Sequence, residues 1–153
     1  MADKIQILLA DDDKDDCFLF REALSELSIS TNLETVYDGE QLMSYLNERA
    51  DRLPHVLFLD LNMPRKNGFE CLSEIKHNDK IKHLPVVMFS TSYPRDMHYE
   101  NDIMKLLYKI GARDYIRKPE NFNLLKEVIH DILVKIEAEM PKAGKSNSEK
   151  TSN

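Results

Sequence analysis

The chain has 153 residues, of which 42% are hydrophobic and 31% charged, and its formal net charge is −6. This length and composition predict one globular domain and exclude a collagen-like or wholly disordered chain. An acidic protein repels phosphate backbones, which argues against general nucleic-acid binding. The longest apolar runs, of about four residues, are far shorter than the roughly 20 that a membrane-spanning helix needs. We therefore expect a cytoplasmic protein that binds neither nucleic acid nor membrane.

Short apolar segments alternate along the chain with longer amphipathic ones. The short segments predict five strands, at Ile5–Ala10, Leu33–Tyr37, Val56–Asp60, Val86–Ser90 and Asp114–Arg117. The third and fourth strands contain continuous apolar runs rather than alternating ones. Such runs are typical of parallel strands that are covered on both faces.

Apolar residues at steps of three and four predict a helix after each strand. These residues are Cys17, Phe20, Leu24 and Leu27; Leu42, Met43 and Leu46; Phe69, Leu72 and Ile75; Ile103, Leu106, Leu107 and Ile110; and Leu124, Leu125, Val128, Ile129, Ile132, Leu133 and Ile136. Gly111 is placed to end the fourth helix. Five strand–helix units predict an α/β fold with a parallel sheet. The two cysteines, Cys17 and Cys71, have no metal-ligand spacing and are expected to be buried thiols.

Reactive side chains follow the predicted strands directly. They are Asp11 and Asp12 after the first strand, Asp60 at the end of the third, Ser90 and Thr91 at the fourth, and Lys118 after the fifth. In open α/β sheets, ligands bind beyond the carboxyl ends of the strands. Clustered carboxylates repel one another, and Mg²⁺, which prefers oxygen ligands, relieves that repulsion. One carboxylate can then attack phosphorus, while a lysine and a hydroxyl neutralise the phosphoryl oxygens. The pattern predicts metal-assisted phosphorylation of an aspartate.

In its sequence motifs, the chain resembles the receiver domain of two-component response regulators. The motifs that carry the resemblance run in the family's order: Ile7–Asp13, Leu57–Pro64, Asn67-Gly68, Leu84–Thr91 and Gly111–Pro119. The resemblance implies a receiver domain over residues 1–139, with a (βα)5 doubly wound, five-stranded parallel sheet of the flavodoxin-like or CheY-like type. The implied strand order is 2-1-3-4-5. Residues 140–153 are rich in Lys, Ser and Asn, so we expect a disordered tail and no output domain.

The resemblance also implies roles for the residues at the sheet edge. Asp60 would be the phosphoacceptor, and Lys118 would bridge to the phosphoryl oxygens. Mg²⁺ would be held by Asp11, Asp12, Asp60 and the backbone carbonyl of Asn62.

Further implied residues concern the response to phosphorylation. Ser90, with Thr91 beside it, would be the switch hydroxyl, and Tyr115 would be the aromatic switch that turns inward on activation. The family also suggests a cis peptide bond before Pro119.

Other acidic residues have a simpler interpretation. Asp13, Asp15 and Asp16 precede or begin the first helix, where carboxylates commonly cap the helix and interact with its dipole. The segment from Ser92 to Ile110 is longer than usual for the family. We expect a loop at 93–95, with Asp96 capping the next helix.

The resemblance implies a stand-alone phosphoacceptor rather than an enzyme in the usual sense. Its partner would be a histidine kinase or a histidine phosphotransfer protein, with phytochrome-type kinases among the candidates. The phosphorylated surface would bind an unnamed partner, form a homodimer or pass the phosphoryl group onward. One alternative is a degenerate receiver that acts as a phosphorylation-independent interaction module. A less favoured alternative is an aspartyl phosphohydrolase of the haloacid dehalogenase type, whose second aspartate is replaced here by Asn62.

Overall fold

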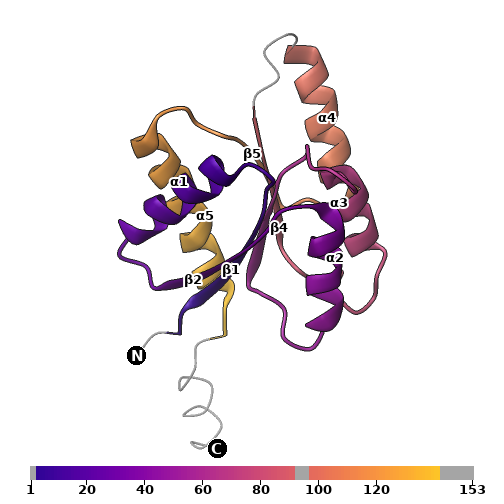
Figure 1. Cartoon of the computed structure of the whole chain (residues 1–153), viewed down its shortest axis with the longest axis horizontal. Helices are drawn as coiled ribbons and strands as arrows, with labels where there is room; N and C mark the ends of the chain where they lie inside the picture. Colours follow the sequence, from indigo (N-terminus) through magenta and orange to yellow (C-terminus); the bar gives the residue numbers. More distant parts are fainter. Residues whose placement is uncertain (1–2, 92–96, 142–153) are drawn as a thin grey trace, which may run out of the picture.

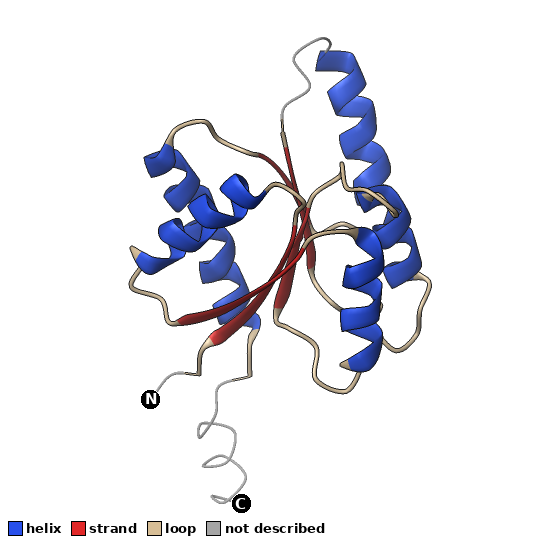
Figure 2. Ribbon diagram, viewed as in Figure 1, coloured by secondary structure: helices blue, strands red, loops and turns tan. Residues whose placement is uncertain are grey.

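Five parallel strands form one sheet with helices on both of its faces (Figures 1 and 2). The computed structural model describes residues 3–91 and 97–141. The strands are β1 (Ile5–Ala10), β2 (Thr31–Val36), β3 (Val56–Leu59), β4 (Val86–Ser90) and β5 (Asp114–Arg117). The helices are α1 (Lys14–Ser25), α2 (Gly39–Glu48), α3 (Gly68–Lys76), α4 (Met97–Ile110) and α5 (Phe122–Glu139).

The strand order is β2-β1-β3-β4-β5, and every neighbouring pair is parallel, as predicted. The predicted bounds of β1, β4 and β5 are confirmed. The second strand begins two residues earlier than predicted, at Thr31, and ends at Val36. The third ends at Leu59, so Asp60 lies just beyond the strand rather than within it.

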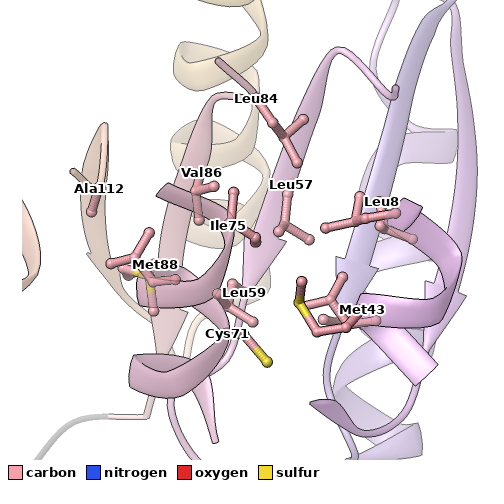
Figure 3. Close-up of a cluster of buried hydrophobic side chains, with 14 of the residues drawn as sticks. Leu8, Met43, Leu57, Leu59, Cys71, Ile75, Leu84, Val86, Met88 and Ala112 are labelled. Atoms are coloured by element: carbon pink, nitrogen blue, oxygen red, sulfur yellow. The ribbon is translucent and has the colours of Figure 1, made fainter. Parts of the chain in front are cut away.

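Two apolar cores fill the space between the sheet and its helices. On one face, Leu8, Leu57 and Leu59 pack with residues of α2, α3 and α4 (Figure 3). On the other face, Ile7 and Phe58 pack with residues of α1 and α5. Because successive side chains of a strand point to opposite faces, the continuous apolar runs supply both cores at once. All residues of β3 and β4 are buried, which confirms that these strands are covered on both sides.

Helix ends are set by local side chains. Asp13 caps α1 by accepting hydrogen bonds from the N–H groups of Asp15 and Asp16, which confirms its predicted capping role. Gly111 ends α4 with φ of 133°, a conformation that residues with a Cβ rarely adopt.

Both cysteines are buried free thiols, as predicted. Burial raises the pKa of Cys17 to about 11 and that of Cys71 to about 12, so both stay protonated near neutral pH. The predicted loop at 93–95, the predicted cap at Asp96 and most of the expected tail lie outside the described residues. Among the helices that are described, none is long and apolar enough to cross a membrane.

Candidate functional site

The carboxyl ends of the central strands bring the predicted site residues together. Asp11 directly follows β1, Asp60 directly follows β3, and Ser90 is the last residue of β4. Backbone hydrogen bonds continue just past the strands: the N–H of Asp60 donates to the carbonyl of Ala10 at 3.0 Å, and that of Lys118 donates to the carbonyl of Ser90 at 2.8 Å. Residues far apart in the sequence are therefore held at one edge of the sheet.

Gly68 lets the start of α3 lie against the backbone of this edge. Its N–H donates to the carbonyl of Leu61 at 2.8 Å. A Cβ at this position would lie 2.4 Å from the carbonyl oxygen of Asp60 and 2.7 Å from Cα of Leu61. Both atoms belong to the backbone and cannot move aside cheaply. The Asn67-Gly68 pair thus caps α3 and provides the space that the loop after Asp60 needs.

Asp60 is buried, with 4% of its surface exposed. Its Oδ1 accepts a hydrogen bond from the hydroxyl of Ser90 at 3.2 Å and from the N–H of Asn62 at 3.3 Å. Its Oδ2 lies 3.6 Å from Nζ of Lys118. Ser90 is buried and its hydroxyl contacts the carboxylate, whereas the neighbouring Thr91 is exposed.

Lys118 faces more carboxylates than the sequence analysis predicted. Its Nζ donates to Oδ2 of Asp11 at 2.6 Å and to Oδ2 of Asp16 at 2.9 Å. The ammonium also lies 5.8 Å from the centre of the Phe89 ring. The sequence favours a role for Asp16 at the helix start; the signal that could place it beside the site is the start of α1 at Lys14, two residues after the acidic pair.

Burial changes the acidity of these groups. It raises the pKa of Asp11 from 3.8 to about 6, although the contact with Lys118 acts in the opposite direction. Burial also raises the pKa of Asp60, against the opposing effect of Lys118. For Lys118, burial lowers the pKa, but its contacts with Asp11, Asp60 and Asp16 outweigh that effect and leave the pKa above its ordinary value. The lysine is therefore charged, while the carboxylates resist ionisation.

The oxygen atoms of three carboxylates converge at this edge. Ligand atoms of Asp11, Asp12 and Asp60 all lie within 4.8 Å of one another. An all-oxygen donor set of this charge suits a hard divalent cation such as Mg²⁺, which accepts a few carboxylates and completes its shell with water. These residues therefore fit the predicted metal. For Asn62, the structure gives the contact of its N–H with Asp60, and the role of its carbonyl oxygen stays a prediction.

A second polar cluster joins β5 to α4. The hydroxyl of Tyr115 donates to Oε2 of Glu100 at 3.0 Å, and Nε of Arg117 donates to the same oxygen at 3.1 Å. A second nitrogen of Arg117 donates to the other oxygen of Glu100. Glu100 is only 7% exposed. Glu100 could not be found from the sequence, because its partners lie in a strand that follows the helix and no local pattern pairs them.

The expected cis bond before Pro119 is wrong for this structure. None of the described peptide bonds is cis, and Lys118 and Pro119 are both described. The trans form is the ordinary preference even before proline.

Residues 7–130 match the family described as the response regulator receiver domain. The chain belongs to this family. It is also 34% identical over 130 residues to the response regulator Rcp1 of Synechocystis sp.. The matched stretch covers 82% of this chain and 84% of Rcp1. The chain is 31% identical over 133 residues to FilR2 of Methanothrix harundinacea, a probable methanogenesis regulatory protein. This match covers 85% of this chain and 82% of FilR2.

Solved structures share both the fold and part of the sequence. The receiver resembles the phosphorylated cyanobacterial phytochrome response regulator RcpA with a TM-score of 0.72 and 36% identity, over 85% of this chain and 91% of that one. It resembles an Mn²⁺-bound form of Rcp1 with a TM-score of 0.70 and 32% identity, over 83% of this chain and 90% of that one. The predicted fold and family are thereby confirmed.

Proposed function

We propose that this receiver accepts a phosphoryl group on Asp60 from a histidine kinase or a histidine phosphotransfer protein, with Mg²⁺ bound at Asp11, Asp12 and Asp60. The observation that carries the proposal is the placement of one buried carboxylate between Ser90 and Lys118. In a member of the receiver family, this arrangement combines a nucleophile with a hydroxyl and a cation that can contact a phosphoryl group.

The proposed reaction is a displacement at phosphorus. An oxygen of Asp60 forms a new bond to phosphorus, while the bond from phosphorus to the donor's leaving atom breaks and the leaving group keeps that electron pair. Mg²⁺, when bound, would neutralise charge on the carboxylates and on the phosphoryl oxygens. Lys118 donates a hydrogen bond to one phosphoryl oxygen, and the hydroxyl of Ser90 donates a hydrogen bond to a different one. Later attack of water on phosphorus releases inorganic phosphate and regenerates the carboxylate.

We propose that the response passes through Ser90 and Tyr115. When the hydroxyl of Ser90 turns toward a phosphoryl oxygen, it leaves Oδ1 of Asp60, and the end of β4 adjusts with it. Tyr115 lies on the neighbouring strand and is linked to α4 through Glu100. A small displacement at the site would therefore change the surface formed by α4 and β5 by shifting an existing two-state equilibrium.

The partners are proposed from the relatives. Rcp1 and RcpA are named as response regulators, and RcpA as a phytochrome response regulator. We therefore propose a phytochrome-type histidine kinase as the donor. We further propose that residues 1–139 form the receiver in the cytoplasm and that its phosphorylated surface signals by binding a second molecule, a partner protein or another copy of the receiver.

Incubation with acetyl phosphate followed by intact mass measurement tests the proposal. We expect the wild type to gain one phosphoryl group only with Mg²⁺, and Asp60→Asn to gain none. Asp51→Asn, which removes an exposed carboxylate from the loop before β3, at the opposite end of that strand from Asp60, is the matched control and should behave as the wild type. A folded wild type that gains no mass would favour the phosphorylation-independent interaction module. Steady release of phosphate from small phosphate esters would instead favour a phosphohydrolase.

A further inference from the structure

Asp16 contacts the cation of the candidate site without being one of the predicted metal ligands. It lies in the first turn of α1, and its side chain is 31% exposed. Its Oδ2 is 2.9 Å from Nζ of Lys118, which is a hydrogen-bonded ion pair. Asp15, the preceding residue, is exposed to solvent and forms no ion pair with a cation of the described residues. The two neighbouring carboxylates thus differ in their relation to Lys118.

The ammonium of Lys118 lies closer to α1 than to Asp60. It has three N–H donors, and two of them point to Asp11 at 2.6 Å and to Asp16 at 2.9 Å. Oδ2 of Asp60, at 3.6 Å, is beyond hydrogen-bond distance. In this structure the lysine therefore donates hydrogen bonds to Asp11 and Asp16 rather than to Asp60, so its charge is already shared with two carboxylates.

We propose that Asp16 is a positioning residue that holds Lys118 toward α1 and competes with a phosphoryl group on Asp60 for the lysine's charge. This inference rests on the proposed function, because it concerns the state in which Asp60 carries a phosphoryl group. Asp11 would be engaged by the metal in that state. Asp16 is then the carboxylate that still opposes the approach of Lys118 to the phosphoryl oxygens.

Neutralising Asp16 should favour the phosphorylated form. Beryllofluoride is a suitable probe, because it adds to a carboxylate as a tetrahedral group that resembles a phosphoryl group. We expect Asp16→Asn to bind beryllofluoride about two- to five-fold more tightly than the wild type in saturating Mg²⁺, the range expected for a partly exposed ion pair. Isothermal titration calorimetry measures the affinity.

Three comparisons separate positioning from a general change of charge or fold. Asp15→Asn removes the same charge from the same helical turn and should bind beryllofluoride as the wild type does. Asp16→Glu restores a carboxylate and should return the affinity toward the wild-type value. Added salt should reduce the difference between the wild type and Asp16→Asn, because salt screens the partly exposed ion pair. A merely structural role would not produce this salt dependence.

The outcomes also separate this inference from the proposed function. If the wild type binds beryllofluoride but Asp16→Asn binds it no more tightly than Asp15→Asn does, the positioning role is overturned and the proposed function stands. Weaker binding by Asp16→Asn overturns the inference as well, since Asp16 would then support the lysine rather than compete for it. If the wild type binds no beryllofluoride with Mg²⁺, the proposed function and the inference fail together.

Discussion

Two clusters of the molecule bury charged side chains, one around Lys118 and one around Glu100. They differ in how negative and positive charge are balanced. At the first, one ammonium faces the carboxylates of Asp11, Asp16 and Asp60. At the second, one carboxylate, that of Glu100, accepts hydrogen bonds from a guanidinium and a tyrosine hydroxyl. The first cluster has an excess of negative charge, whereas the second is compensated.

The difference indicates what each cluster can do. A buried carboxylate without enough positive charge nearby is costly, and a metal ion or a proton removes that cost. The excess charge beside Lys118 therefore favours cation binding and keeps Asp60 and Asp11 hard to ionise. A compensated cluster has no such demand and instead fixes the position of its members. Glu100 thereby connects Tyr115 to α4.

The largest expected effect comes from removing the lysine of the acidic cluster. We expect Lys118→Ala to lower the free energy of unfolding by about 3–5 kcal/mol without metal, because buried carboxylates lose their partner. Denaturant unfolding measures the change, and Mg²⁺ should restore part of the loss. Lys105→Ala, at an exposed position of α4, is the control. A loss no larger than that of the control would mean that Lys118 does not balance this cluster.

Neutralising the carboxylate of the compensated cluster should destabilise the protein. We expect Glu100→Gln to lower the free energy of unfolding by about 1.5–3 kcal/mol, because the hydrogen bonds that Arg117 and Tyr115 donate to a charged carboxylate are weakened. The same unfolding measurement applies, with Asp102→Asn as an exposed control on α4. An increase in stability would contradict the contrast between the clusters.

Neutralising a carboxylate of the acidic cluster should instead raise the free energy of unfolding. The raised pKa of Asp11, about 6 against 3.8, means that ionisation of this group opposes folding. In the wild type this cost is absent below pH 3.8 and grows as the pH rises through about 6. We expect Asp11→Asn without metal to gain about 1–3 kcal/mol near neutral pH and to lose that gain under acid. A gain that does not depend on pH would contradict this account.

The smallest effect should come from one hydroxyl of the compensated cluster. Tyr115→Phe removes the hydrogen bond to Glu100 and leaves the ion pair with Arg117 in place. We expect a loss of about 0.5–1.5 kcal/mol in thermal or denaturant unfolding. A loss as large as that of Glu100→Gln would show that the hydroxyl, rather than the guanidinium, compensates the buried carboxylate.

Much of the fold could be predicted because local pattern and topology agree. The continuous apolar runs of β3 and β4 indicate burial on both faces, and the strand–helix alternation limits the sheet to parallel arrangements. The convergence of Asp11, Asp60, Ser90 and Lys118 then follows, because each lies at or just beyond the end of a neighbouring strand.

The contacts of long side chains could not be predicted in the same way. Asp16 has the features of an ordinary acidic residue in a first helical turn, and only the approach of Lys118 from β5, 102 positions away, gives it a second role. Glu100 depends likewise on two side chains of a later strand. Such pairings are set by the direction of side chains in space and leave no periodic signal in the sequence.

Identification of the modified residue tests the central claim most directly. Borohydride reduces an aspartyl phosphate to homoserine with release of phosphate, which leaves a stable mark that peptide mass spectrometry can locate. After treatment with acetyl phosphate and Mg²⁺, we expect homoserine in place of Asp60 and unmodified carboxylates at Asp11, Asp12 and Asp16. Homoserine at one of those three positions, with Asp60 unchanged, would contradict the assignment of Asp60 as the phosphoacceptor.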